Sequence, residues 1–255
     1  MARIGTALGV LMLASALAAI PARAATPQVD LALVLAIDVS GSVNAQRWEL
    51  QRHGYETAFN SPEVLQAVTS GPNKSIAVTM VEWSGARHQK QVVDWVVITD
   101  PVSAAAFASA MAEAPRVYSD WTSISAALEF AAPLFRASGI EANRKVIDVS
   151  GDGVNNQGPN VTDTRDEIVA KGIVINGLPI LTEYEFLDGY YRDRVIGGAG
   201  SFMEVAKDYS SFTTAVQAKL VREIAGNEAR ARAILAHRPG PPIGGQTASA
   251  PASSR

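Results

Sequence analysis

Apolar runs that alternate with helical segments constrain the fold of this 255-residue chain more than any other feature. Residues 31–37 are continuously apolar, which is typical of a strand covered on both faces of a sheet. The Ser-Gly-Ser turn that follows leads into a segment in which Trp48, Tyr55 and Phe59 recur at helical spacing. The folded part of the chain is therefore expected to begin with a strand and a helix.

The same alternation continues along the chain. Further strands are expected at residues 75–83, 91–98, 145–149 and 173–179. Further helices are expected at residues 101–114, 122–135, 162–172 and 212–224. Asp100 and Pro101 cap and start the first of these helices, Pro133 kinks or shortens the second, and Thr162 caps the third. This order predicts an α/β fold of the Rossmann-like, doubly wound type, with a mostly parallel central sheet and helices on both faces.

One segment, residues 182–200, follows neither period and concentrates tyrosine and arginine. Tyr184, Tyr190, Tyr191 and the nearby arginines are residue types that are enriched where proteins touch partners. The other interpretation is a tyrosine-bearing loop packed on the domain. The sequence leaves both open.

The two ends of the chain differ from its middle. Arg3, an apolar run over residues 4–20 and Ala22-Arg23-Ala24 form the three parts of a secretory signal peptide, with cleavage expected after Ala24. An uncleaved membrane anchor is the alternative, but the run is short for a span and Pro21 interrupts it. The domains expected are a signal peptide (1–24), one folded domain (25–236) and a disordered tail rich in Pro, Gly, Ala and Ser (237–255).

The overall composition narrows the compartment and the partners. The chain has no cysteine, so neither disulfides nor thiolate metal sites are available. Loss of the leader removes two arginines and changes the net charge from −3 to −5, and this mildly acidic chain is not expected to bind nucleic acid. No membrane span is expected in the mature chain, which is placed in the periplasm or outside the cell.

Three polar stretches follow predicted strands or precede a predicted helix. They are Asp38-Val39-Ser40-Gly41-Ser42, Asp120-Trp121-Thr122 and Ser150-Gly151-Asp152-Gly153. In open parallel sheets, ligands bind at the carboxyl ends of the strands, where these stretches are expected to meet. They supply hydroxyls and carboxylates without histidine or thiol, which favours a hard cation such as magnesium, manganese or calcium.

These motifs closely resemble the metal-ion-dependent adhesion site (MIDAS) of the von Willebrand factor type A (VWA) family. The resemblance spans roughly residues 29–224 and is strongest to a branch of uncharacterised secreted bacterial proteins. It implies that Ser40, Ser42 and Thr122 bind a divalent cation directly, with Mg²⁺ favoured over Mn²⁺ or Ca²⁺. Asp38 and Asp152 are then implied to act mainly through water. It also implies that an Asp or Glu carboxylate of an unidentified partner protein completes the coordination.

Three details of this site stay open at the sequence level. Asp148 repeats the Asp-x-Ser spacing and is either a residue that supports a metal ligand or a buried strand acid. Asp152 is preferred as the ligand because a strand precedes it and a glycine follows. Ser123 is an alternative to Thr122. A degenerate site that keeps the fold without the metal is a further alternative.

The function expected is binding without chemistry. A serine hydrolase would need a histidine base, and His53, His88 and His237 lie in a helix, a polar turn and the tail. The sequence contains neither a Gly-x-Ser-x-Gly elbow nor a phosphate loop. A structural subunit of an envelope complex, in which the metal only stiffens the loops, is the alternative to a metal-dependent interaction module.

Overall fold

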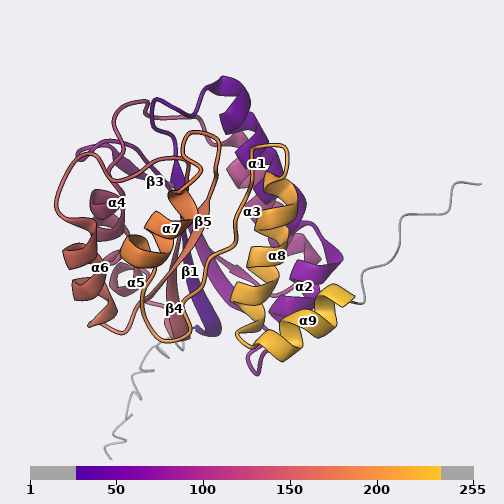
Figure 1. Ribbon diagram of the computed structural model, residues 1–255. Coiled ribbons are helices and arrows are strands. Elements are labelled where there is room, and N and C mark those ends of the chain that lie inside the picture. The colour runs from indigo at the N-terminus through magenta and orange to yellow at the C-terminus, as the bar shows by residue number, and fades with distance from the viewer. Residues whose placement is uncertain (1–26, 237–255) are drawn as a thin grey trace, which may run out of the picture.

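The structure is a computed structural model that describes residues 27–236. The expected signal peptide (1–24) and the expected tail (237–255) lie outside the described residues. A five-stranded sheet in the order β3-β2-β1-β4-β5 forms the centre (Figure 1). Its strands are β1 (Gln28–Asp38), β2 (Ile76–Trp83), β3 (Gln89–Ile98), β4 (Glu141–Gly151) and β5 (Val174–Pro179).

The sheet is mixed but mostly parallel. β1 pairs in parallel with β2 and β4, and β4 pairs in parallel with β5. β3 is antiparallel to β2, as the short connection between them requires. Residues 202–206 run parallel beside β5 and touch it through isolated bridges from Gly177 to Met203 and from Ile180 to Ala206. The prediction of a doubly wound α/β fold is confirmed.

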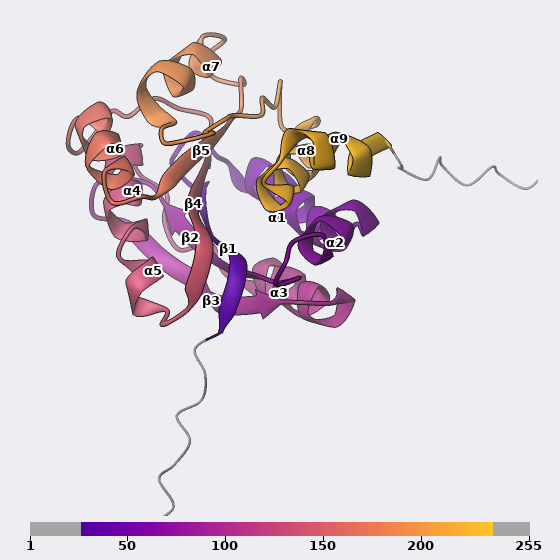
Figure 2. The same ribbon diagram turned by 90° about the horizontal axis from the view of Figure 1, so that it is seen from below.

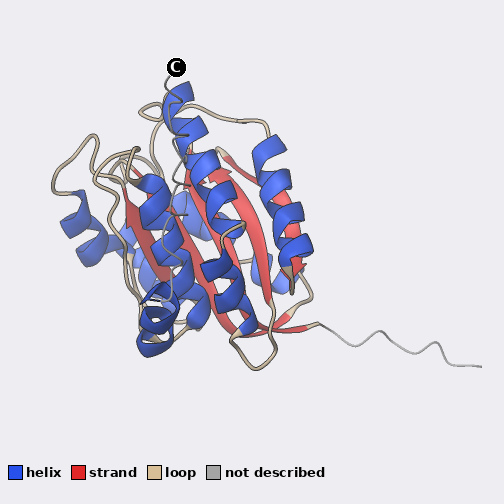
Figure 3. Ribbon diagram, turned by 90° about the vertical axis from the view of Figure 1, so that its right-hand side faces the viewer, coloured by secondary structure: helices blue, strands red, loops and turns tan. Residues whose placement is uncertain are grey.

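Helices cover both faces of the sheet (Figure 2). One face carries α1 (Ala45–Phe59), α2 (Pro62–Thr69), α3 (Pro101–Glu113), α8 (Phe212–Ala225) and α9 (Glu228–Ala236). The other carries α4 (Ile124–Ala131), α5 (Leu134–Ala137), α6 (Val161–Val169), α7 (Leu187–Tyr190) and the π-helical turn η1 (Tyr191–Val195). In Figure 3, long helices of one layer run beside the strands that they cover.

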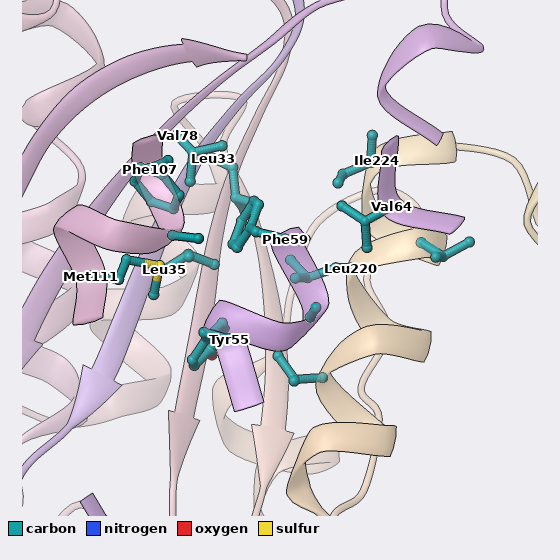
Figure 4. Close-up of a cluster of buried hydrophobic side chains, with 14 of the residues drawn as sticks. Leu33, Leu35, Tyr55, Phe59, Val64, Val78, Phe107, Met111, Leu220 and Ile224 are labelled. Atoms are coloured by element: carbon teal, nitrogen blue, oxygen red, sulfur yellow. The ribbon is translucent and has the colours of Figure 1, made fainter. Parts of the chain in front are cut away.

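The side chains of β1 alternate between two hydrophobic cores. Leu33 and Leu35 point into the larger core with Tyr55 and Phe59 of α1 and Leu220 of α8 (Figure 4). The smaller alanine and valine side chains at the even positions pack in the second core, against α4 and α6. Each fully buried leucine contributes roughly 1.5–3 kcal/mol, so the two cores fix β1 in the centre of the sheet.

Local signals for helix ends are confirmed in two places and wrong in a third. Asp100 caps α3 in a capping box with Ser103, and α4 ends before Pro133. The expected cap at Thr162 is wrong, because Asn160 caps α6 and its side chain accepts the N–H of Thr162 at 2.9 Å. Asn160 is extended and lies two residues earlier, so its amide oxygen reaches the first turn.

Each of the two interpretations of residues 182–200, a loop packed on the domain and a surface that touches partners, fits one part of the segment. Tyr191 and Leu187 are fully buried in the second core, so this part of the segment packs on the domain. Tyr184 and Phe186 are exposed. Within residues 27–236, no helix is both long enough and apolar enough to cross a membrane.

Candidate metal site

The three polar stretches meet at the carboxyl edge of the sheet. β1 and β4 are adjacent and parallel, with Ile37 paired with Ser150, so the loops that follow these strands emerge side by side. The backbone N–H of Gly41 donates to the carbonyl of Asp120 at 2.7 Å, which joins the first stretch to the second. The expected convergence of the stretches is therefore present in the fold.

Asp38 ends β1 with a fully buried carboxylate. One oxygen, Oδ1, accepts the backbone N–H of Ser40 at 2.7 Å. The other, Oδ2, has no hydrogen-bond partner among the described residues. Burial and, secondarily, the charge of Asp152 raise the pKa of Asp38 to about 7. A buried carboxylate oxygen of this kind is costly unless a cation, a proton or water meets it.

Ser40 and Ser42 bring two hydroxyls to the same place. Their Oγ atoms lie 3.2 Å apart, because alternate side chains of this turning segment face the same way. Ser42 Oγ donates to Asp152 Oδ1 at 2.5 Å, which connects the first stretch to the third. Hydrogen bonds thus connect four of the five predicted ligand residues in series, from Asp38 to Ser40, Ser42 and Asp152.

Asp152 is fully buried just beyond β4. Its Oδ2 accepts the hydroxyl of Tyr209 at 2.9 Å and lies 3.5 Å from Nη1 of Arg47. Burial raises the pKa of Asp152, while the hydrogen bonds from Ser42 and Tyr209 and the charge of Arg47 oppose the rise. Arg47 also donates to Glu183 and to the carbonyl of Ser42, so it ties the loop after β5 to the first stretch.

Thr122 is the fifth predicted ligand, and its backbone is held on both sides. Its N–H donates to Asn156 Oδ1 at 3.0 Å, and its carbonyl accepts the N–H of Asn156 at 2.9 Å. A side chain added at Gly153 would lie 3.4 Å from Thr122 Oγ1, so that hydroxyl sits against the residue that follows Asp152.

A pocket of about 330 Å³ opens over these residues. Ser42, Thr122 and Asp152 line it, whereas Asp38 and Ser40 are buried behind them. The rest of its wall includes Trp121, Asp120, Asn156, Glu183 and Tyr184. The predicted direct ligands Ser42 and Thr122 are therefore reachable from outside.

The backbone of β4 passes very close to Asp38. A Cβ atom on Gly151 would lie 2.8 Å from Asp38 Oδ2 and 3.1 Å from the hydroxyl of Tyr191. That hydroxyl is also buried without a hydrogen-bond partner among residues 27–236. Glycine is thus required at position 151 because a side chain would not fit there, and not because of its backbone dihedral angles.

This donor set fits a hard divalent cation. In the described part of the chain, no group of three or more His, Cys, Asp and Glu side chains is arranged to hold a metal. The site instead gathers three hydroxyls and two carboxylates, which are oxygen ligands of the kind that Mg²⁺, Mn²⁺ and Ca²⁺ prefer. The partnerless oxygen of Asp38 and the raised pKa values of both acids are what such a cation would relieve.

Asp148 and Ser123, the two alternative ligand residues, do not line the pocket. Asp148 is a buried strand acid that pairs with Lys219 of α8 at 2.7 Å, on the face of the sheet covered by α1 and α8. Ser123 caps α4 and donates to the carbonyl of Gln157 at 2.8 Å. Asp152 and Thr122, the residues preferred from the sequence, are the ones that line the pocket.

Sequence reasoning missed Arg47, Tyr209 and Glu183, and it named Tyr191 only as part of the segment 182–200 and not as a neighbour of Asp38. Glu183 follows β5, so the rule that ligands gather beyond the carboxyl ends of strands would have found it. Arg47 lies in the first turn of α1, and its guanidinium reaches back to the carbonyl of Ser42. Nothing in the local sequence marks Tyr209, because an irregular segment brings it to Asp152.

Solved structures share this fold. Proximal thread matrix protein 1 (PTMP1) from the mussel byssus matches with a TM-score of 0.60 and 15% identity, over 78% of this chain and 49% of that chain. A von Willebrand factor type A protein from Catenulispora acidiphila matches at 0.55 and 14%, over 77% and 43%. The pilus adhesin SpaC from Lactobacillus rhamnosus GG matches at 0.52 and 13%, over 78% and 31%. This chain thus spans half or less of each of them.

The sequence comparisons give a family. No curated protein matches the sequence. The model of the family described as "Protein of unknown function (DUF1194)" matches residues 28–228, which include all five strands and the whole candidate site. The chain therefore belongs to the DUF1194 family, and its fold is that of a VWA domain.

Proposed function

We propose that this chain is an exported protein-binding module that depends on a divalent cation and has no catalytic activity. The observation that carries the proposal is the pair of buried acids Asp38 and Asp152 beneath an open pocket that Ser42 lines. Buried acids with a raised pKa next to serine hydroxyls are arranged as a cation site would need them.

In this proposal Ser40, Ser42 and Thr122 bind the cation directly, and Asp38 and Asp152 hold water and balance its charge. Hydroxyl ligands add no charge, so a bound Mg²⁺, or Mn²⁺ or Ca²⁺ in its place, would keep an affinity for a carboxylate from a partner protein. The pocket over Ser42 and Thr122 leaves room for that carboxylate.

The similar structures support this direction. One structure of PTMP1, 12% identical to this chain, is described as having a zinc-occupied MIDAS motif, and SpaC is described as a pilus adhesin. The sequence pattern of a secretory leader over residues 1–24 agrees with a place in the periplasm or outside the cell.

The surroundings of the described histidines support binding without chemistry. His88 faces Asp120 at 2.9 Å and stacks on Tyr118, and His53 faces Glu56 from an exposed position on α1. Within residues 27–236, neither histidine hydrogen-bonds a serine hydroxyl, whereas a hydrolase of the serine type would need its histidine base beside the serine nucleophile.

The test is isothermal titration of Mg²⁺, Mn²⁺ and Ca²⁺ into the chelator-treated mature chain. We expect about one equivalent to bind the parent and none to bind the double variant Ser40→Ala, Asp152→Ala. The matched control is Ser201→Ala with Asp163→Ala, which removes the same two residue types outside the site and should bind like the parent.

Equal binding by the parent and the Ser40/Asp152 variant would overturn the site. No binding by a folded parent would instead favour the structural subunit, whose complex survives chelation.

A further inference from the structure

Exposed aromatic side chains gather at the mouth of the pocket. Within residues 27–236, four large apolar side chains are exposed, and three of them are Trp121, Tyr184 and Phe186, at 59%, 41% and 60%. Trp121 and Tyr184 line the pocket, and the ring of Phe186 lies 5.3 Å from that of Tyr184. We call Trp121, Tyr184 and Phe186 the aromatic rim.

The fourth exposed apolar residue lies elsewhere. Val102 is in the first turn of α3, just after β3. Because β3 is antiparallel and its last residue, Ile98, pairs with the first residue of β2, Val102 lies at the end of the sheet opposite the pocket. The aromatic rim is therefore a local concentration and not a general property of this surface.

Two loops present the rim, and both are fixed to the domain. Trp121 lies between Asp120, whose carbonyl accepts from Gly41, and Thr122, which is bonded on both sides to Asn156. Tyr184 follows Glu183, whose side chain pairs with Arg47, and the carbonyl of Tyr184 accepts the N–H of Leu187 at 3.2 Å. Loops held in this way present aromatic groups without a large loss of conformational entropy on binding.

The position of the rim decides which ligand it suits. A partner carboxylate that reaches the pocket beside Ser42 and Thr122 comes close to Trp121 and Tyr184, because all four residues line the same pocket. The groups next to that carboxylate on the partner chain then lie against aromatic faces. Aromatic side chains that meet apolar groups at a desolvated centre are typical binding hot spots.

We infer that the aromatic rim selects a protein segment in which an Asp or Glu is directly flanked by bulky apolar side chains. The inference rests on the proposed function, since the carboxylate is the group that the cation takes. The rim adds what the cation alone does not provide, namely discrimination among acidic residues by their neighbours.

The test is selection of a random peptide library, displayed on phage, against the immobilised mature chain with Mg²⁺ and with chelator. We expect clones enriched only with Mg²⁺ to share an acidic residue with an aromatic or branched aliphatic neighbour. Clones that share the acid but show no preference beside it would overturn the inference and leave the metal-dependent function standing. Enrichment that is the same with chelator would contradict both.

Variants then test the rim with one selected peptide. Trp121→Ala and Phe186→Ala should each weaken its binding by about tenfold or more, as expected for hot-spot aromatic residues. Val102→Ala is the matched control and should leave the affinity unchanged. Metal affinity is measured on every variant, and the inference fails if the loss of peptide binding follows an equal loss of metal binding, or if the rim variants bind like the parent.

Discussion

Asp38 and Asp152 place two acids within one site, and among residues 27–236 Asp38 has no cationic partner while Asp152 has only Arg47. Arg47 stays 3.5 Å from Asp152 and donates its closer bonds to Glu183 and the carbonyl of Ser42. Burial raises the pKa of Asp38 to about 7, so this carboxyl group holds a proton part of the time at neutral pH. A cation at the proposed site would compete with that proton for the same carboxylate.

This competition predicts a pH dependence of the metal-free protein. The pKa of Asp38 is near 7 when folded and about 3.8 when unfolded, so the folded state binds more protons between these values. The free energy of unfolding should therefore fall as pH rises from about 4 to 7. Asp38→Asn removes this term and should stabilise the metal-free chain at pH 8 by up to about 4 kcal/mol, with little difference near pH 4.

Urea unfolding of both proteins in chelator, across pH 4.5–8, measures the difference between them. Asp148, a buried acid outside the site, is the same in both proteins and cancels, whereas the interaction between the charges of Asp38 and Asp152 is part of the measured difference. A variant that is no more stable than the parent at pH 8 would show that Asp38 is not protonated by burial.

Two neighbouring glycines give a second prediction at this scale. Gly151→Ala places a methyl group 2.8 Å from Asp38 Oδ2 and should weaken metal binding at least tenfold by displacing that carboxylate. Gly153→Ala is the comparison and should weaken metal binding less, because its methyl group would meet Thr122 Oγ1 at 3.4 Å, an ordinary van der Waals distance. Titration of Mg²⁺ into both folded variants is the measurement, and equal affinities would contradict the geometry.

The sequence predicted which residues meet at the pocket, but not the residues that hold them in place. Asp38, Ser42, Thr122 and Asp152 could be placed because each lies at the end of a strand, shortly after one, or just before a helix, where sequence and position are directly related. Tyr209 could not, because its contact with Asp152 depends on the path of an irregular segment and no periodic pattern encodes that path.

At the scale of elements, a buried ionic cluster connects α8 to the sheet. Lys219 of α8 lies 2.7 Å from both Asp148 of β4 and Glu223, and Asn176 of β5 donates to Glu223 at 2.7 Å. Burial and the charge of Glu223 raise the pKa of Asp148, and Lys219 opposes the rise. All three ionic side chains are essentially inaccessible to solvent, so each depends on the others.

Lys219→Met should therefore reduce the free energy of unfolding by about 3–5 kcal/mol, because it leaves two buried acids without their cation. Arg52→Met is the control, since its ion pair with Glu49 is partly exposed and contributes about 1 kcal/mol or less. Urea unfolding measures both. Adding Asp148→Asn and Glu223→Gln to Lys219→Met should restore part of the loss, and a triple variant less stable than Lys219→Met would contradict the account.

Elements were predictable where a strong local signal marked them. The buried strands and the proline-started α3 follow from patterns that tertiary contacts do not override. The eight-residue α2 was missed because it is too short to show a period, although Ser61 and Pro62 start it as a cap and a first-turn proline do elsewhere. The cap of α6 was misplaced because Asn160 and Thr162 are both good caps and only backbone geometry separates them.

At the scale of the whole molecule, a cation that binds only the folded state must stabilise all of it. At a concentration one hundred times the dissociation constant, Mg²⁺ should add about 2.7 kcal/mol. For a domain of this size, that corresponds to a rise in Tm of roughly 5–10 °C. A thermal melt of the parent should show this rise and lose it in chelator, and the Ser40→Ala, Asp152→Ala variant should show neither. A rise that persists in the variant would place the cation elsewhere.

The segment at residues 202–206 has a consequence for how this molecule can associate with others. Its isolated bridges occupy the outer side of β5, where Gly177 donates to Phe202 and accepts from Glu204. At the opposite border of the sheet, β3 carries the exposed charges of Lys90 and Asp94. Neither edge of the sheet presents a long, uncharged row of free backbone N–H and C=O groups with which a strand of another chain could pair. Self-association by strand addition is therefore disfavoured even at high local concentration. For the proposed binding function, this leaves the loops above the sheet as the place of recognition.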